Sequence, residues 1–326
     1  MKLLTQEQIT AFKKFIDSHN SFIVAGHKEP DGDCVASSLG IARLLKAFGK
    51  NYCILNAGPF KRTEIRPYEK YFTSVLPKSF QKAEDAAVII VDCSELSRLG
   101  DADPIITRLD TYILDHHKTA ECSGNAIVDP TSPAAACIVQ QLYEALVGPL
   151  DKETADILFF GLSTDTGFFR FLDTNSAEVF MAASRLVAAG ANPRSTYDEI
   201  TGGKPWSTRK LLGTMLDKAE RYYGGKLIIT TENLEDTRRM GSEGRDSDSL
   251  YQLLLAVEGV EAVVFVREET DKTCTLGFRS RNEVDVSSIA SVFGGGGHKN
   301  ASGALTEGTP GSLIPKIKEE FCKFFK

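Results

Sequence analysis

The chain has 326 residues, of which 42% are hydrophobic and 25% charged, and it carries a formal net charge of −6. This composition is typical of a soluble globular protein, and the length allows two domains of ordinary size. A negative chain lacks the basic surface that long duplex nucleic acid requires, and no apolar run approaches the roughly 20 residues of a membrane span. We therefore expect neither a long duplex nor a membrane as a partner.

The N-terminal residues predict a helix, because Thr5 and Gln8 have the spacing of a capping box and apolar residues follow at helical intervals. They lack the long apolar core and the cleavage site of a secretion signal. The seven cysteines include no CxxC pair, which argues against a disulfide framework and a zinc ribbon. These features favour a cytoplasmic protein.

Short apolar runs alternate with helical segments over roughly the first 190 residues, and this order predicts an α/β domain with a parallel sheet. Gly49, Gly148 and Gly190 stand where helix C-caps are expected. We predict strands at 21–26, 52–55, 86–92, 111–115 and 126–129, and helices at about 34–48, 133–147, 152–163 and 176–189.

A stretch with two prolines and a glycine pair, at 191–207, predicts the connection between two domains. We place the first domain at 1–192, the linker at 193–206 and a smaller α/β domain at 207–326. In the second domain, adjacent strands separated by a short turn indicate a mixed sheet. The expected order is a helix near 207–221, a strand at 225–231, a helix near 247–257, strands at 261–269 and 272–281, and helices at 285–293 and 311–325.

Aspartates and histidines gather where the predicted strands of the first domain end, with one more aspartate beyond the helix at 152–163. In open α/β sheets, ligand groups collect at the carboxyl ends of the strands. Each residue alone is more typical of a turn or a helix cap, but together they form a negative cluster that is costly without cations. The residues are His27, Asp31, Asp33, Asp92, Asp115, His116, His117 and Asp165.

The residue types in this group predict a site for divalent cations. Carboxylates and imidazoles without thiolates suit Mn²⁺, Fe²⁺ or Mg²⁺ better than structural zinc. Cys34 and Cys93 each follow an aspartate of the group, and we expect both to pack inward as small apolar side chains.

The motifs "GHKEPDGD", "VDCS", "DHH" and "STDTG", in this order, resemble those of the DHH phosphoesterases. The C-terminal segment "FRSR…VDVSSIASVFGGGGHKNASG" is similar to the DHH-associated domain that accompanies them. The resemblance covers nearly the whole chain. It implies a two-metal phosphohydrolase with its active site in a cleft between the two domains.

The resemblance also implies a role for each residue. Two adjacent divalent ions, most simply Mn²⁺, would activate water and neutralise charge developing on phosphorus. Asp115 would orient a neighbouring imidazole, and His117 would face the substrate as the residue that donates a hydrogen bond or a proton. One metal would be held by His27, Asp31 and Asp92, and the second by Asp33, Asp92, His116 and Asp165, with Asp92 bridging.

The second domain is expected to bind the phosphates of the substrate. Glycines let backbone N–H groups approach a phosphate closely, and a guanidinium offers two parallel donors. The simpler alternative is a flexible glycine loop flanked by solvated charges. No Walker-type lysine follows the glycines, which excludes a P-loop. The candidate residues are Arg279, Arg281, Gly295, Gly296, Gly297 and His298.

Among DHH phosphoesterases, the chain resembles the compact subfamily of bifunctional oligoribonucleases (nanoRNases) and pAp phosphatases. This resemblance implies hydrolysis of very short RNA, such as pApA, and of adenosine 3′,5′-bisphosphate (pAp). The lysine- and arginine-rich signature of family II pyrophosphatases is absent. A soluble phosphodiesterase of cyclic or linear dinucleotides and a non-catalytic nucleotide-binding protein remain as alternatives, and a homodimer stays open.

Overall fold

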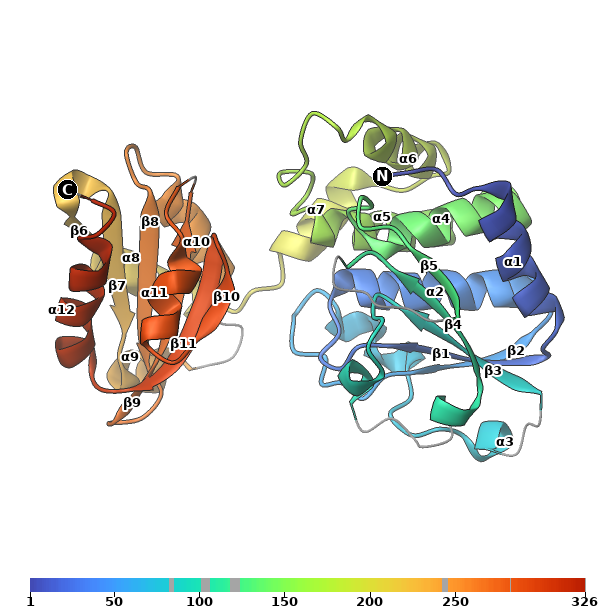
Figure 1. The fold of residues 1–326 in the computed structure, drawn as a ribbon, viewed down its shortest axis with the longest axis horizontal. Coiled ribbons are helices and arrows are strands. Elements are labelled where there is room, and N and C mark those ends of the chain that lie inside the picture. The colour runs from blue at the N-terminus through green and yellow to red at the C-terminus, as the bar shows by residue number, and fades with distance from the viewer. Residues whose placement is uncertain (82–84, 101–105, 118–123, 242–245, 282, 326) are drawn as a thin grey trace. The chain divides into compact units, whose positions relative to one another are not determined.

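The computed structural model describes residues 1–81, 85–100, 106–117, 124–241, 246–281 and 283–325, and it divides into two compact units, Met1–Gly203 and Lys204–Lys326 (Figure 1). Among these residues, no helix is both long and apolar enough to cross a membrane. In the first unit the helices and strands are α1 (Gln6–Asp17), β1 (Ser21–Gly26), α2 (Gly32–Ala47), β2 (Asn51–Leu55), α3 (Lys78–Gln81), β3 (Ala86–Val91), β4 (Asp110–Asp115), β5 (Asn125–Val128), α4 (Ala135–Leu146), α5 (Lys152–Asp165), α6 (Ala177–Ala188) and α7 (Pro193–Thr201).

The first unit is built on a parallel five-stranded sheet in the order β2-β1-β3-β4-β5, which confirms the predicted α/β architecture. The central strand β3 is buried along its whole length, as expected of a strand covered on both faces. From the central pair β1 and β3, the chain adds β2 on the side of β1, and β4 and β5 on the side of β3. The carboxyl ends of these two strands therefore form the switch point at which open α/β sheets collect ligands.

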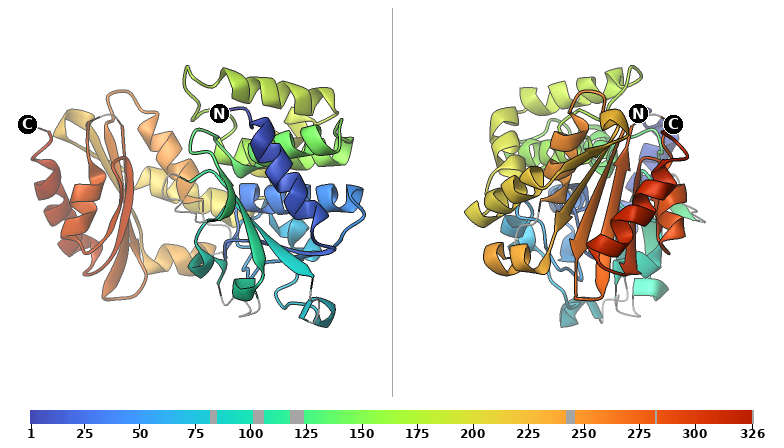
Figure 2. Two further views of the ribbon diagram at one scale, coloured as in Figure 1. Left: turned by 45° about the vertical axis from the view of Figure 1, so that its right-hand side comes forward. Right: turned by 90° about the vertical axis from the view of Figure 1, so that its left-hand side faces the viewer.

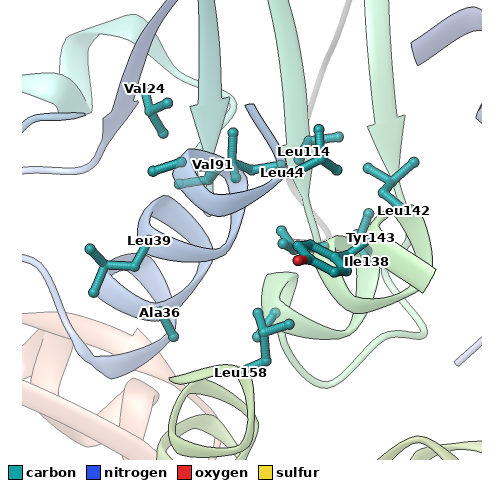
Figure 3. Close-up of a cluster of buried hydrophobic side chains, with 14 of the residues drawn as sticks. Val24, Ala36, Leu39, Leu44, Val91, Leu114, Ile138, Leu142, Tyr143 and Leu158 are labelled. Carbon is teal, nitrogen blue, oxygen red and sulfur yellow. The ribbon is translucent and has the colours of Figure 1, made fainter. Parts of the chain in front are cut away.

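Alternating strand side chains fill two apolar cores, one on each face of the sheet. One face packs against α1, α2, α4, α5 and α6, and the other against shorter segments of chain (Figure 1). Figure 3 shows part of the first core, where Val24, Val91 and Leu114 of the strands lie near Leu44 of α2 and Leu142 of α4. The alternation fixes the register of each strand, because a shift by one residue would exchange the two faces.

The predicted helix ends are found at several positions. Thr5 and Gln8 form the expected reciprocal capping box at the start of α1. Gly49, Gly148 and Gly190 follow α2, α4 and α6 with φ angles of 68°, 112° and 110°, a region in which glycine is favoured. The sequence was sufficient to predict these helix ends, because each capping signal acts within a single helical turn.

The stretch predicted as a linker begins with a helix, α7, which belongs to the first unit. The side chain of Asn192 accepts hydrogen bonds from the backbone N–H groups of Arg194 and Ser195, and Pro193 occupies the first turn. Asparagine followed by proline is an N-terminal helix signal, although prolines also mark linkers. The structure divides the chain after Gly203, which lies inside the stretch predicted as the linker.

The second unit contains a mixed six-stranded sheet in the order β10-β11-β9-β8-β7-β6. Among the strands that the structure describes in this unit, only β7 and β8 are parallel neighbours. Helices α8 and α10 pack on one face and α11 and α12 on the other; the right-hand view of Figure 2 shows α12 in red. The elements are α8 (Trp206–Asp217), β6 (Glu220–Tyr222), β7 (Leu227–Glu232), α9 (Leu234–Met240), α10 (Ser247–Leu255), β8 (Ala262–Glu268), β9 (Thr273–Ser280), α11 (Val286–Val292), β10 (Gly296–His298), β11 (Ala301–Glu307) and α12 (Pro310–Phe321).

The expected glycine loop is partly a strand. Gly296–His298 forms β10, which pairs antiparallel with β11 at one edge of the sheet. The short strand β6 and the helix α9 were also not predicted. These elements are three to seven residues long, too short for hydrophobic periodicity to reveal them.

Helices α2, α4 and α5 approach one another closely at small residues. A Cβ atom on Gly161 of α5 would lie 2.5 Å from Cβ of Ala36 and 3.0 Å from Cβ of Ala136. It would also lie 3.3 Å from Oδ1 of Asp33. The close approach therefore places the first turns of α2 and α4 beside the last turn of α5.

We expect Gly161→Ala to lower the melting temperature of the chain. Overpacking a tight contact costs about 1–3 kcal/mol, which exceeds the roughly 1 kcal/mol that alanine gains over glycine in a helix. Gly213→Ala in α8 is the matched control, because no atom lies within 4 Å of its added Cβ, and it should be neutral or stabilising. Calorimetric unfolding in EDTA gives the melting temperatures of both variants. An equal rise in the two melting temperatures would contradict the tight packing at Gly161.

Candidate metal centre

The carboxylate of Asp92 lies at the middle of the candidate site, immediately after β3. It is 1% exposed, and its oxygens point to different imidazoles. Oδ2 is 3.3 Å from Nε2 of His27, and Oδ1 is 3.2 Å from Nε2 of His116. The φ angle of Asp92 is 54°, an unfavourable left-handed conformation that aspartate tolerates better than most residues. Strain of this kind is typical of functional sites.

His27 and Asp31 flank one side of Asp92. The His27 ring donates from Nδ1 to the carbonyl oxygen of Lys28 at 2.9 Å, which turns Nε2 toward the carboxylates. Asp31 is the N-cap of α2, since its Oδ1 accepts from the N–H groups of Asp33 and Cys34. Burial raises the pKa of Asp31, but the nearby imidazole of His27 and the backbone N–H bonds outweigh it and lower the pKa to about 2.

Asp33 is completely buried and caps a helix other than its own. Its Oδ2 accepts from the N–H of Ala135 at 2.5 Å and its Oδ1 from the N–H of Ala136 at 2.8 Å, at the start of α4. The N-cap residue of α4, Ala134, supplies no side-chain acceptor. Burial, with repulsion from Asp92, raises the pKa of Asp33 to about 7.

His116 lies on the other side of Asp92, opposite His27. Its Nε2 is 3.4 Å from Oδ2 of Asp165 and 3.8 Å from Oδ2 of Asp33. Burial lowers the pKa of His116, but the nearby carboxylates of Asp92 and Asp33 raise it to about 10. Burial also raises the pKa of Asp165 well above its usual value.

His117 is held by Asp115 at the end of β4. Oδ1 of Asp115 accepts from Nδ1 of His117 at 2.7 Å and from the backbone N–H groups of His116 and His117. The His117 side chain is 37% exposed, whereas that of Asp115 is fully buried. Asp115 thus fixes the ring of His117 and leaves its Nε2 as the nitrogen available to a ligand.

Several buried polar atoms of this group lack a hydrogen-bond partner in the described part of the chain. They are Oδ1 of Asp92, Oδ2 of Asp115 and Nε2 of His116. Unbonded buried polar atoms are costly, and a cation coordinated by carboxylate oxygen and imidazole nitrogen would satisfy the first and the last of them. The arrangement therefore fits divalent cations of the Mn²⁺, Fe²⁺ or Mg²⁺ type.

Cys34 lies near His27 and Asp92 but is a poor candidate ligand. Its thiol is completely buried, and burial raises its pKa to about 12, so the thiolate that a metal requires is disfavoured. Cys93 is also buried. Both cysteines pack inward, as expected from the sequence.

All eight residues predicted at this edge of the sheet are linked by side-chain contacts of 3.9 Å or less. Two further groups position the histidines and were not predicted from the sequence. Asn56 is 3% exposed and donates from Nδ2 to the carbonyl oxygen of His27, and the carbonyl of Ser132 faces Nδ1 of His116. Asn56 could have been found, because it directly follows strand β2.

The predicted substrate-binding residues lie in the second unit, around β9 and β10. Arg279 and Gly296 border a cavity there, whereas Arg281, Gly295, Gly297 and His298 are not part of its lining. At two of these glycines the neighbouring backbone leaves no room for a side chain. A Cβ on Gly295 would lie 2.1 Å from the carbonyl oxygen of Gly303, and a Cβ on Gly297 would lie 2.6 Å from the carbonyl oxygen of Ala301. The space over Gly296 is open.

The pKa shifts predict that the metal-free chain loses stability as the pH rises. Asp33 and His116 bind protons more tightly in the folded chain than in the unfolded chain. Their contribution to the free energy of unfolding is therefore lost as the pH rises, from 3.8 to about 7 for Asp33 and from 6.5 to about 10 for His116. Metal ligation requires the deprotonated forms and releases these protons. The melting temperature in EDTA should therefore fall between about pH 6 and 9, while the increase caused by Mn²⁺ grows.

His116→Gln is the control for this pH series, because it removes one titrating group and should flatten the decline in EDTA. A Mn²⁺-induced increase that is independent of pH would contradict the assignment of these groups to a metal site.

Comparison with known proteins agrees with this geometry. Residues 21–162 match the family model "DHH family, N-terminal domain", and residues 226–326 match the DHHA1 domain. The bifunctional oligoribonuclease and PAP phosphatase NrnA of Thermus thermophilus is 33% identical over 289 residues, which cover 87% of this chain and 84% of that protein. NrnA of Bacillus subtilis is 25% identical over 304 residues, covering 90% and 92%.

Two further relatives extend the comparison. The cyclic-di-AMP phosphodiesterase PdeA of Listeria monocytogenes is 25% identical over 317 residues, which cover 92% of this chain and 47% of that protein. The crystal structure of an exopolyphosphatase-related protein from Bacteroides fragilis has the same fold, with a TM-score of 0.86, 23% identity and coverage of 100% and 99%. The family matches and the one-third identity to a relative of similar length show that the chain belongs to the DHH family.

Proposed function

We propose that the chain is a metal-dependent phosphohydrolase that degrades very short RNA, such as pApA, to mononucleotides and removes a phosphate from pAp. The observation that carries the proposal is the buried Asp92 carboxylate between two imidazoles, with unbonded buried atoms around it. The substrates are suggested by the NrnA relatives, which are named as bifunctional oligoribonucleases and PAP phosphatases.

The proposed ligand sets keep the assignment implied by the family resemblance, with Mn²⁺ as the first candidate metal. The bound ions would supply Lewis acidity and charge neutralisation at phosphorus. The carboxylate of Asp92 can serve both sites, because each of its oxygens faces a different histidine. His27, Asp31 and Asp92 would hold one ion, and Asp33, Asp92, His116 and Asp165 the other.

His117 is the proposed proton or hydrogen-bond donor. Asp115 holds Nδ1 of the ring, so that Nε2 can donate to a phosphoryl or leaving oxygen. The bond to Asp115 also keeps the ring in one orientation. In the second unit, Arg279 would bind a phosphate that is not being cleaved.

A phosphodiesterase of cyclic or linear dinucleotides is the second candidate. This second candidate is supported by the match to PdeA, which covers 92% of this chain. Assays with pAp, pApA and cyclic-di-AMP on one Mn²⁺-loaded preparation separate the two functions, since the first candidate requires turnover of pAp and pApA.

We expect Asp92→Asn to abolish hydrolysis while leaving the fold intact. Asparagine has nearly the same size and tolerates the left-handed backbone, but it lacks the charge that two cations share. Loss of several kcal/mol of charge stabilisation corresponds to about 100-fold or more in kcat. Asp110→Asn, at the opposite end of β4, is the matched control, and Mn²⁺ titration should show weaker binding only for Asp92→Asn. Two tight Mn²⁺ ions and near-normal turnover in that variant would refute the bridging role.

Activity is expected to fall steeply as the RNA becomes longer. A net negative chain cannot follow a long backbone, which requires an extended basic groove. Initial rates on an RNA ladder from dinucleotide to 24-mer, measured at constant ionic strength, test this. Equal rates across the ladder would exclude an enzyme dedicated to very short RNA.

A further inference from the structure

One face of the six-stranded sheet is only partly covered by helices. On the side of α8 and α10, the apolar core reaches Ile228 of β7 and Val263 and Phe265 of β8. The neighbouring strand β9 is half-exposed at alternate residues, including Gly277 and Arg279, whereas the residues between them are buried on the opposite face. Among the described residues, this apolar core takes no side chain from β9, β11 or β10, so this part of the face is less covered.

Glycines form a continuous strip across this part of the face. Strand pairing places Gly277 of β9 beside Gly303 of β11, and Gly303 beside Gly296 of β10. Phe265 of β8 is the next residue in the same row. Three adjacent strands thus present backbone without side chains at one level, which leaves a flat surface bounded by the larger residues on either side.

A cavity of ≈ 390 Å³ lies over this strip. Its volume is near the lower end of the range for small-molecule sites, about 300–1,000 Å³. The lining combines the glycines with cationic and aromatic side chains from three strands and from α10. It is formed by Ser247, Tyr251, Phe265, Arg267, Thr275, Leu276, Gly277, Arg279, Gly296, Ala301, Ser302 and Gly303.

Tyr251 adds a polar group to the lining of the cavity. The side chain lines the cavity although the residue is only 6% exposed. The hydroxyl lies directly over Gly277, where an added Cβ would be 1.9 Å away. Because Gly277 has no side chain, this hydroxyl can occupy the space at that end of the strip.

The two arginines give the cavity a charged end and a neutral end. The guanidinium of Arg279 lies 4.6 Å from the centre of the Tyr251 ring, and its carboxylate neighbour Asp248 is 4.0 Å away and largely exposed. Arg267 instead donates to Glu269 at 2.8 Å, and Thr275 donates to the same carboxylate oxygen. Arg279, whose carboxylate neighbour is more distant, is thus the less neutralised of the two arginines.

The distance between these ends suits one nucleotide. Arg279 pairs with Val263 and Thr275 with Arg267, so the two arginines stand at levels four residues apart along β8. Four residues of a strand span about 13 Å. A phosphate at Arg279 would therefore leave room on the strip for the sugar and the ring of one nucleoside.

We propose that this cavity is a nucleobase subsite. The phosphate binds Arg279, the base lies flat on Gly303 and Gly296, and its edge meets the hydroxyl of Tyr251, which occupies the space over Gly277. The neutral pair of Arg267 and Glu269 closes the far end and restricts the site to one nucleoside. This inference rests on the proposed function and deepens it, because the base itself contributes affinity and the cavity limits the length of the substrate.

Direct binding tests the subsite without turnover. Isothermal titration of the full chain in EDTA compares AMP with ribose 5-phosphate, which lacks the base. Wild type should bind AMP about tenfold more tightly, the amount expected from one hydrogen bond with apolar burial. Gly303→Val fills the strip and should abolish that preference while leaving ribose 5-phosphate binding unchanged. Tyr251→Phe, which keeps the ring, should reduce the preference about threefold or more.

The control is Leu305→Ala, which changes a 67% exposed residue of the same strand outside the cavity lining and should bind like wild type. If Gly303→Val does not fold, Tyr251→Phe decides. Equal wild-type affinity for both ligands, or an unchanged preference in both variants, would overturn the subsite. Hydrolysis of pApA with Mn²⁺ is measured in parallel, so that an inactive wild type that still prefers AMP counts against the proposed function and supports the subsite.

Discussion

The buried carboxylate of Asp33 couples the helices of the first unit to the candidate metal centre. It supplies the cap that α4 lacks, and it lies 3.8 Å from His116 in the ligand cluster. The N–H groups at the start of α4 and the positive end of its dipole stabilise the negative charge of Asp33, which repulsion from Asp92 disfavours. The start of α4 and the Asp33 carboxylate therefore stabilise each other, which requires the close approach of α2, α4 and α5.

Much of this arrangement could be predicted because it follows from local rules. The strands are continuous apolar runs with polar residues directly after them, and the carboxyl ends of parallel strands necessarily share one edge. Asp92 and His116 could therefore be grouped from sequence. The cap that Asp33 provides could not, since its partner Ala135 lies 102 residues away and is recognised only in three dimensions. For the same reason, the pairing of Gly277 with Gly303 is invisible in the sequence.

The two units carry opposite kinds of chemistry. In the first, acidic and imidazole side chains surround Asp92, and their positions are fixed by caps and backbone carbonyls. In the second, an arginine stands beside an open sheet face. Relatives of this chain are named for different nucleotide substrates, as an oligoribonuclease and PAP phosphatase in one case and a cyclic-di-AMP phosphodiesterase in another. This pattern is expected where a common reaction centre is combined with a separately varying recognition surface.

The sheet of the second unit ends in very short strands on both sides. β10 contains three residues, two of them glycine, and β6 contains three residues that begin with Glu220 and Arg221. Long, flat edges invite other chains to add a strand, and proteins avoid this with brief or charged edges. The same short β10 that leaves the glycine strip uncovered thus offers few unpaired backbone groups to a neighbouring molecule, and so limits edge-to-edge aggregation of a sheet whose face must stay open.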